Sequence, residues 1–178
     1  MFARFGTGDA DEQPRAEPGR WDADERGRAP KEQGIDVTTL KHEDTTGRIL
    51  YAFYKKVYPQ LGYGFLEKVY ENAMACELRR MGLRVEQQAR IDVFYDGVLV
   101  GQYFSDLLVE GAVIVELKAV ERVTEEHKAQ LLNYLRATPH EVGLLLNFGP
   151  RPEHHRKAFD NERKPSITWG ASENNRIG

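Results

Sequence analysis

The chain has 178 residues, enough for one domain with a hydrophobic core, and 30% of them are charged, with a net charge of −3. No apolar run is long enough to cross a membrane, and the first residues lack the apolar stretch of a signal peptide, so neither a membrane span nor secretion is expected. The single cysteine, Cys76, excludes an internal disulfide and a thiolate-rich metal site on one chain, which fits a cytoplasmic protein.

Both ends of the chain differ from its middle. Residues 1–37 are rich in charge, proline and glycine and nearly lack aliphatic side chains, so we expect a disordered tail. Residues 151–178 carry basic side chains diluted by acidic ones. We expect a solvated basic extension there, and the alternative is an arm that binds phosphates. The folded domain is therefore expected at 38–150.

Two amphipathic helices are predicted first. Apolar residues recur at helical spacing from 39 to about 58, and Pro59 and Gly62 are expected to end that helix. A second helix is predicted at 65–81, with Gly82 as its C-terminal stop. The apolar stripe of this second helix is predicted to follow Leu66, Val69, Tyr70, Ala73, Cys76 and Leu78. Cys76 lies on or near that stripe, so it is expected to be a small core residue rather than a nucleophile.

Three strands, a third helix and a fourth strand follow. The predicted ranges are 84–95, 98–109 and 112–119 for the strands, 124–138 for the helix and 142–148 for the last strand. The strand–helix–strand unit at 112–148 implies that its two strands run parallel. The whole order predicts a mixed α/β sandwich.

Charged residues stand in two of these otherwise apolar strands. Asp106 lies in the second strand, and the third ends in Glu116-Leu117-Lys118. Because side chains alternate along a strand, Glu116 and Lys118 share a face. Two carboxylates beside a lysine suit a divalent metal and an activated water. The simpler interpretation is an ordinary salt bridge on a solvated strand face.

The register of the hairpin decides whether Asp106 can join that site. A two-residue turn at Glu110-Gly111 pairs Asp106 with Val115 and turns Glu116 to the opposite face. A three-residue loop at 110–112 instead pairs Asp106 with Glu116 and places both on one face. The residues by themselves leave both registers open.

The order of elements, with Asp106 on the second strand and Glu116-x-Lys118 on the third, resembles the PD-(D/E)XK nuclease superfamily, and within it the chain is similar to the GxxExxY proteins. The motifs that carry the resemblance, spread over about 40–150, are Gly64-Phe65-Leu66-Glu67-Lys68-Val69-Tyr70, Ser105–Val109, Val115–Ala119, Gln130–Leu135 and Gly143–Gly149. Two positions depart from the pattern: Ser105 replaces the proline of the superfamily's name, and Tyr58 stands where relatives often carry histidine.

The resemblance implies a restriction-endonuclease-like core, α-β-β-β-α-β, with a mixed sheet flanked by helices and an extra N-terminal helix. It favours the register that brings Asp106 and Glu116 to one face. It also implies metal-assisted hydrolysis of phosphodiester bonds in nucleic acid, with DNA expected. Asp106, Glu116 and the backbone carbonyl of Leu117 would hold Mg²⁺ or Mn²⁺, and Glu67 would bind the metal directly or through water.

Three further residues receive roles from the resemblance. Lys118 would orient the attacking water or neutralise charge in the transition state. Gln130 and Tyr134 are four residues apart and share a helix face, from which they would position the nucleic-acid strand. Without the resemblance, Glu67 would be part of a solvated helix face and Tyr134 a half-buried tyrosine with a polar neighbour.

Two alternatives to a nuclease remain open at this point. The domain could be a nucleic-acid- or protein-binding module that keeps the fold without efficient turnover, because a fold alone does not determine activity. The acidic N-terminal segment could also regulate the domain by occupying a basic groove.

Overall fold

The computed structural model describes residues 41–164, so the tail predicted at 1–37 and the chain from 165 onward lie outside the described residues. The elements in chain order are α2 (Glu43–Tyr51), the π-helix η1 (Ala52–Val57), α3 (Tyr58–Leu61), α4 (Glu67–Arg80), β1 (Val85–Tyr95), β2 (Val98–Val109), β3 (Val113–Lys118), α5 (Glu125–Ala137), β4 (Val142–Asn147), β5 (Glu153–Ala158) and the 3₁₀ helix η2 (Asn161–Arg163). Within 41–164, none of the helices is long and apolar enough to span a membrane.

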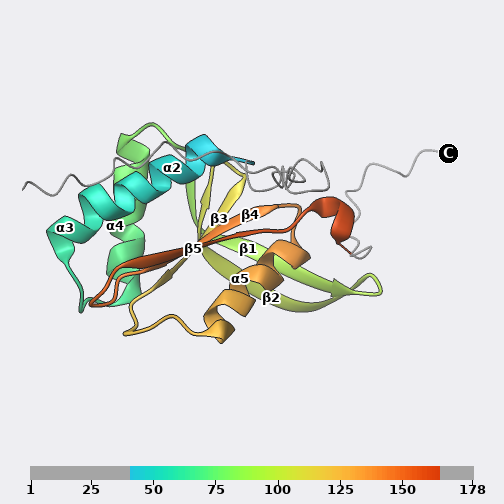
Figure 1. Cartoon of the computed structure of the whole chain (residues 1–178). Helices are drawn as coiled ribbons and strands as arrows, with labels where there is room; N and C mark the ends of the chain where they lie inside the picture. The colour runs from blue at the N-terminus through green and yellow to red at the C-terminus, as the bar shows by residue number, and fades with distance from the viewer. Residues whose placement is uncertain (1–40, 165–178) are drawn as a thin grey trace, which may run out of the picture. The chain divides into compact units, whose positions relative to one another are not determined.

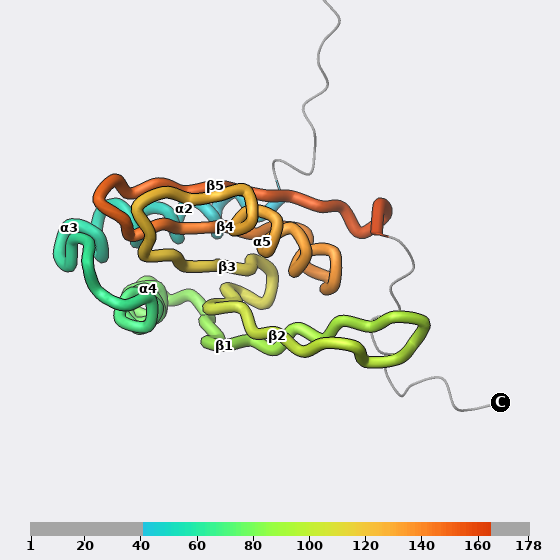
Figure 2. The backbone as a smooth tube through the Cα atoms, turned by 90° about the horizontal axis from the view of Figure 1, so that it is seen from below, coloured from blue at the N-terminus to red at the C-terminus, as the bar shows by residue number. Residues whose placement is uncertain are grey.

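Five strands form one mixed sheet in the order β1-β2-β3-β4-β5 (Figure 1). Strands β3 and β4 pair in parallel, as the strand–helix–strand unit predicted, and the other neighbours pair antiparallel. Figure 2 shows the β1–β2 hairpin reaching beyond the ends of the other strands. The prediction of a mixed α/β sheet flanked by helices is confirmed.

Helices cover both faces of this sheet. On one face, α2, η1 and α4 pack over a large apolar cluster that includes Leu107, Val115 and Leu144. On the other face, α5 packs Leu131 and Leu135 into a smaller cluster with side chains of the sheet. Strands β3 and β4 lie at the centre and are buried on both sides, which explains why they read as nearly continuous apolar runs in the sequence.

The first helix runs further than predicted. It continues as the π-helix η1 and then as α3 to Leu61, where Gly62 ends it with a left-handed backbone (φ 65°). Of the two residues expected to end the helix, Gly62 does so and Pro59 does not. Pro59 lies in the first turn of α3, directly after the wide π turns, and a proline in a first turn lacks an N–H that would have no partner there.

Helix α4 presents a different face to the core than predicted. Its buried residues are Tyr70, Glu71, Met74, Ala75 and Leu78. Cys76 is exposed, so the prediction that it is a core residue is wrong. The apolar stripe was placed through Leu66 and Val69, which remain 80% and 40% exposed, and this rotated the predicted face. Gly82 ends the helix as predicted, with its N–H donating to the Arg79 carbonyl at 2.9 Å.

The region after residue 150 is not a solvated tail at its start. Residues Glu153–Ala158 form β5, which pairs antiparallel with β4 at the edge of the sheet. The segment is mostly charged and polar because an edge strand is bonded on one side only and stays half exposed. The composition of this strand is therefore similar to that of a solvated tail, which is why the sequence did not predict a strand here.

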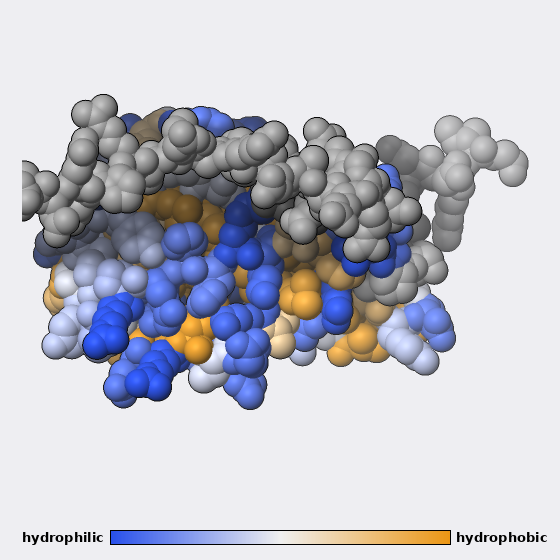
Figure 3. All heavy atoms as spheres, viewed as in Figure 1, coloured by the Kyte–Doolittle hydropathy of each residue, from blue (hydrophilic) through white to orange (hydrophobic). Residues whose placement is uncertain are grey.

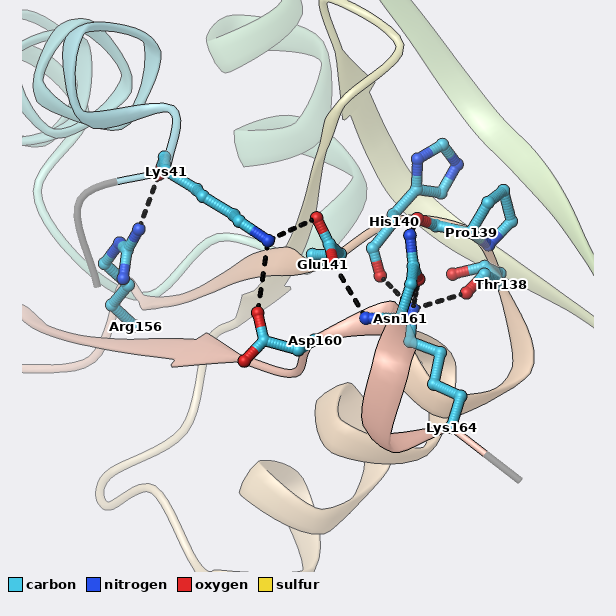
Figure 4. Close-up of polar contacts among 9 residues, drawn as sticks. All are labelled: Lys41, Thr138, Pro139, His140, Glu141, Arg156, Asp160, Asn161 and Lys164. Carbon is cyan, nitrogen blue, oxygen red and sulfur yellow. Dashed lines mark hydrogen bonds and ion pairs between the residues drawn. The ribbon is translucent and has the colours of Figure 1, made fainter. Parts of the chain in front are cut away.

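A polar network anchors both ends of the described chain to the start of β4 (Figure 4). Lys41 donates through Nζ to Glu141 at 3.0 Å and to Asp160 at 3.1 Å, and its own carbonyl accepts a bond from Arg156. The backbone N–H of Asn161 donates to the same Glu141 carboxylate at 2.7 Å. This network joins the N-terminal helix to the segment that follows β5.

The loop that leaves β3 depends on a glycine. Asn147 is fully buried and bonds both backbone groups of Val120, accepting from the N–H at 3.1 Å and donating to the carbonyl at 2.9 Å. The chain passes so close to this loop at Gly149 that a Cβ atom there would lie 2.0 Å from the Val120 carbonyl oxygen. The contact fixes the backbone two residues beyond Lys118.

We predict that Gly149→Ala lowers the free energy of unfolding by about 2–3 kcal/mol, because the Val120 backbone must move and its two bonds to Asn147 weaken. Gly47→Ala is the matched control. Gly47 lies inside α2 with nothing within 4 Å of its added Cβ, so this change is expected to stabilise the helix by about 0.5–1 kcal/mol. Urea denaturation measures both, and equal effects in the two variants would contradict the prediction.

Candidate active site

The register of the β2–β3 hairpin brings Asp106 opposite Glu116. Leu107 pairs with Val115 and Val109 with Val113, so the same register continues one step to Asp106 and Glu116. The loop at 110–112 has the three-residue form. Its first two residues, Glu110 and Gly111, have φ values of 55° and 62°. Of the two registers left open by the sequence, this is the one that allows both carboxylates to share a site.

The two strands separate at this point. The pairing between β2 and β3 ends at Leu107, and beyond it β2 continues only with β1 as the hairpin. We call the place where β2 leaves β3, between Asp106 and Leu117, the fork. There the Asp106 Oδ2 accepts a hydrogen bond from the Leu117 N–H at 2.7 Å. The side chain thus accepts from a β3 donor that no longer has a backbone partner in β2. Burial raises the pKa of Asp106, against the opposing effects of this N–H and of Lys118.

Glu116 is the most perturbed acid of the site. The residue is 3% exposed, and burial, followed by the charge of Asp106, raises the pKa of its carboxyl to about 8. Lys118 lies on the same strand face, with Nζ 3.5 Å from Glu116 Oε2. The other oxygen, Oε1, is buried and has no hydrogen-bond partner in the described part of the chain. A buried carboxylate oxygen without a partner is costly, so this atom is free for a ligand.

Glu67 stands at the rim of the same site. It is the first residue of α4 and is exposed, and its Oε1 accepts a hydrogen bond from the Ala119 N–H at 3.3 Å. Its negative charge contributes to the raised pKa of Asp106 as the smallest of several causes. The structure therefore brings Glu67 to the end of β3, one residue past Lys118.

Gln130 and Tyr134 approach the carboxylates from α5. Gln130 Nε2 donates to the Tyr134 hydroxyl at 2.8 Å, so the shared helix face predicted for them is present. Burial raises the pKa of Tyr134, and the charges of Glu116 and Asp106 add to the shift, while the Gln130 bond opposes it. The tyrosine hydroxyl thus lies within electrostatic reach of both acids.

One buried acid near the site was given no role by the sequence. Glu71 is 2% exposed, and its carboxylate accepts bonds from Lys68 at 2.6 Å, Gln88 at 2.8 Å and Gln87 at 3.0 Å. Its charge also raises the pKa of Asp106. Gln88 has a left-handed backbone (φ 54°), which is uncommon for a residue other than glycine. The sequence feature that could have pointed to Glu71 is its position one helical turn after Glu67, which places both acids on the same side of α4.

The acids do not enclose a metal by themselves. Within residues 41–164, no three His, Cys, Asp or Glu side chains converge closely enough to hold an ion. Asp106 and Glu116 are close enough for the charge of Asp106 to raise the pKa of Glu116. Any ion there would need ligands from the backbone or from water, which hard cations such as Mg²⁺ accept readily.

Comparison with known proteins agrees with this geometry. A family model described as the PD-(D/E)XK nuclease superfamily matches residues 43–159, more than half of the chain. No curated protein matches. A solved structure, "Crystal structure of SSO0001", is similar at 16% sequence identity with a TM-score of 0.43. The match covers 68% of this chain and 61% of that one, so the chain spans less than two thirds of that protein. On the family match, the chain belongs to the PD-(D/E)XK nuclease superfamily.

Proposed function

We propose that this protein is a nuclease that uses Mg²⁺ or Mn²⁺ to hydrolyse phosphodiester bonds of DNA. The observation that carries the proposal is the Glu116 carboxyl, which is buried, lies beside Lys118, feels the charge of Asp106, and has one oxygen without a hydrogen-bond partner among residues 41–164. A binding module would gain nothing from this costly arrangement. The finer resemblance to the GxxExxY proteins and a cytoplasmic location stay predictions.

The residues present fit a divalent cation. Asp106 uses one oxygen for the Leu117 N–H, and Glu116 has its partnerless Oε1, so each acid can offer an oxygen. The backbone carbonyl of Leu117 is the proposed third ligand, and Glu67 at the rim would bind directly or through water. Oxygen donors of this kind suit Mg²⁺ and Mn²⁺, which members of this superfamily generally use.

A cation held there would lower the pKa of a water and offset charge on the phosphate. Lys118 is 14% exposed at its side chain and is held beside Glu116, so its ammonium is positioned to donate to a phosphate oxygen as negative charge develops. The Tyr134 hydroxyl, held by Gln130, is positioned to orient the strand on the α5 side. Glu116 and Asp106 stay fixed by the strands that carry them.

Two substitutions separate a nuclease from a binding module. We predict that Lys118→Ala lowers the rate of Mg²⁺-dependent cleavage by about 10²–10³-fold while metal binding is mostly kept, because an ammonium is no metal ligand but stabilises developing charge. Asp106→Ala is expected to lose both cleavage and metal binding. Cleavage of single- and double-stranded DNA and calorimetry with Mg²⁺ measure the two properties.

Lys55→Ala is the control for these variants, since Lys55 is an exposed lysine of η1 and its replacement is expected to leave cleavage within a few-fold of wild type. If the wild type binds nucleic acid without any metal-dependent cleavage, and both variants bind equally well, the binding-module alternative replaces the nuclease. If Lys118→Ala cleaves as fast as wild type, the role given to Lys118 is wrong and the nuclease stands.

The raised pKa of Glu116 predicts how stability changes with pH in EDTA. The folded state binds the Glu116 proton up to about pH 8, whereas the unfolded chain releases it near 4.5. The protein should therefore lose stability as pH rises from about 5 to 8, by about 2–4 kcal/mol from this group. Glu116→Gln removes the ionisation, so the variant should be more stable than wild type at pH 8.5 and less dependent on pH. Thermal melts across pH 5–9 check this, and parallel curves would contradict it.

A further inference from the structure

A pocket of about 650 Å³ lies between α5 and the β1–β2 hairpin, beside the candidate active site. Its volume falls within the range of about 300–1,000 Å³ that is usual for small-ligand sites. Tyr134 and Gln130 line it; the charges of Glu116 and Asp106 act on Tyr134, and Gln130 donates to the Tyr134 hydroxyl. On the face that carries α5, apolar surface shows between the charged side chains (Figure 3). Tyr134 is therefore the residue that links the pocket to the site of the proposed chemistry.

An aromatic ring forms the wall on the hairpin side. Tyr103 of β2 is 51% exposed, and its ring lies 6.0 Å from that of Tyr134 at an angle of 45°. The two rings are neighbours without being stacked. The pocket is lined by both apolar and polar side chains, with Glu126 and Arg136 among the polar ones. A half-exposed tyrosine ring at its edge is a surface on which a planar group can stack.

The pocket also offers a free amide. Asn133 of α5 lines it and is exposed, and its side chain has no hydrogen-bond partner within residues 41–164. An asparagine amide both donates and accepts, as the edges of nucleobases do. A stacking ring with an amide beside it suits a planar heterocycle with polar edges.

We propose that this pocket holds one unpaired base of a single-stranded nucleic acid, stacked on Tyr103 and contacted by Asn133, while the adjoining phosphate lies at Asp106, Glu116 and Lys118. The inference rests on the proposed function and names its substrate class. A base in a duplex is stacked and paired, so it would have to be extruded before it could enter, at a cost of a few kilocalories per mole. Single strands and frayed ends are therefore the preferred substrates.

Binding in EDTA tests the pocket apart from cleavage. The probe is a fluorescein-labelled thymine-rich DNA single strand carrying one 2-aminopurine, alone or annealed to its complement. The full chain should bind the single strand more tightly than the duplex and quench the 2-aminopurine on binding. Tyr103→Ala should weaken single-strand binding by about 5- to 100-fold and abolish the quenching, while Tyr103→Trp should keep both.

Phe104→Ala is the matched control. Phe104 is 52% exposed, as Tyr103 is, and is the next residue of the same strand, but it does not line the pocket. It is expected to bind as wild type does. The same oligonucleotide made of RNA shows whether the pocket selects the base alone or also the sugar.

The outcomes separate this inference from the proposed function. If the wild type cleaves DNA but Tyr103→Ala binds single strands normally, or loses single strand and duplex alike, the base pocket is wrong and the nuclease stands. If the wild type cleaves nothing yet binds single strands through Tyr103, the pocket stands and the nuclease is wrong. If Phe104→Ala weakens binding as much as Tyr103→Ala, the hairpin acts as a general surface and the pocket is overturned.

Discussion

The hydrogen bond from the Leu117 N–H to the Asp106 carboxylate holds the site together, because it lies where two strands separate. Beyond Leu107, β2 leaves β3, and a backbone donor of a buried strand would be left without its partner. The Asp106 side chain accepts from that donor and is itself held between the strands. Glu116 stays buried beside the fork, and Lys118 is the partly exposed residue at this end of β3. One interaction thus satisfies the backbone and fixes an acid next to Glu116.

The fork is accompanied by an inversion of the pleat in the β1–β2 hairpin. Gln87 pairs with Leu107, and both contact the α4 side of the sheet. Ile91 pairs with Tyr103, and both contact the α5 side, although regular alternation would keep positions four apart on one face. The left-handed Gln88 lies between these pairs and marks the change. The left-handed backbone of Gln88 therefore allows the β1–β2 hairpin to contact α4 near Gln87 and Leu107, and to line the pocket on the α5 side near Tyr103.

The features predicted correctly from the sequence are those that periodicity and short motifs determine, namely the order of most helices and strands and the strands that carry the acids. The sequence placed Asp106, Glu116 and Lys118 on their strands, and the register that joins the acids came from the resemblance, since turn residues alone allowed two loops. Glu71 received no role because the apolar stripe of α4 was drawn through Val69, which is 40% exposed. Strand β5 was missed because an edge strand needs no apolar alternation. Tyr103 carried no signal, because its neighbour Tyr134 is distant in the sequence and only the fold brings them together.

The two buried acids near the fork, Glu71 and Glu116, differ in how many hydrogen-bond partners they have. This difference supports the proposed place of the cation. Glu71 is as deeply buried as Glu116, but a lysine and two glutamine amides satisfy it, so its charge needs no further partner. Glu116 has Lys118 at 3.5 Å on one oxygen and, within residues 41–164, no hydrogen-bond partner on the other. Its ionised form is therefore unfavourable, and the pKa of about 8 means that without a cation the carboxyl keeps its proton at neutral pH. A cation would replace that proton, so the contrast with the satisfied Glu71 supports the proposal that an ion binds at Glu116.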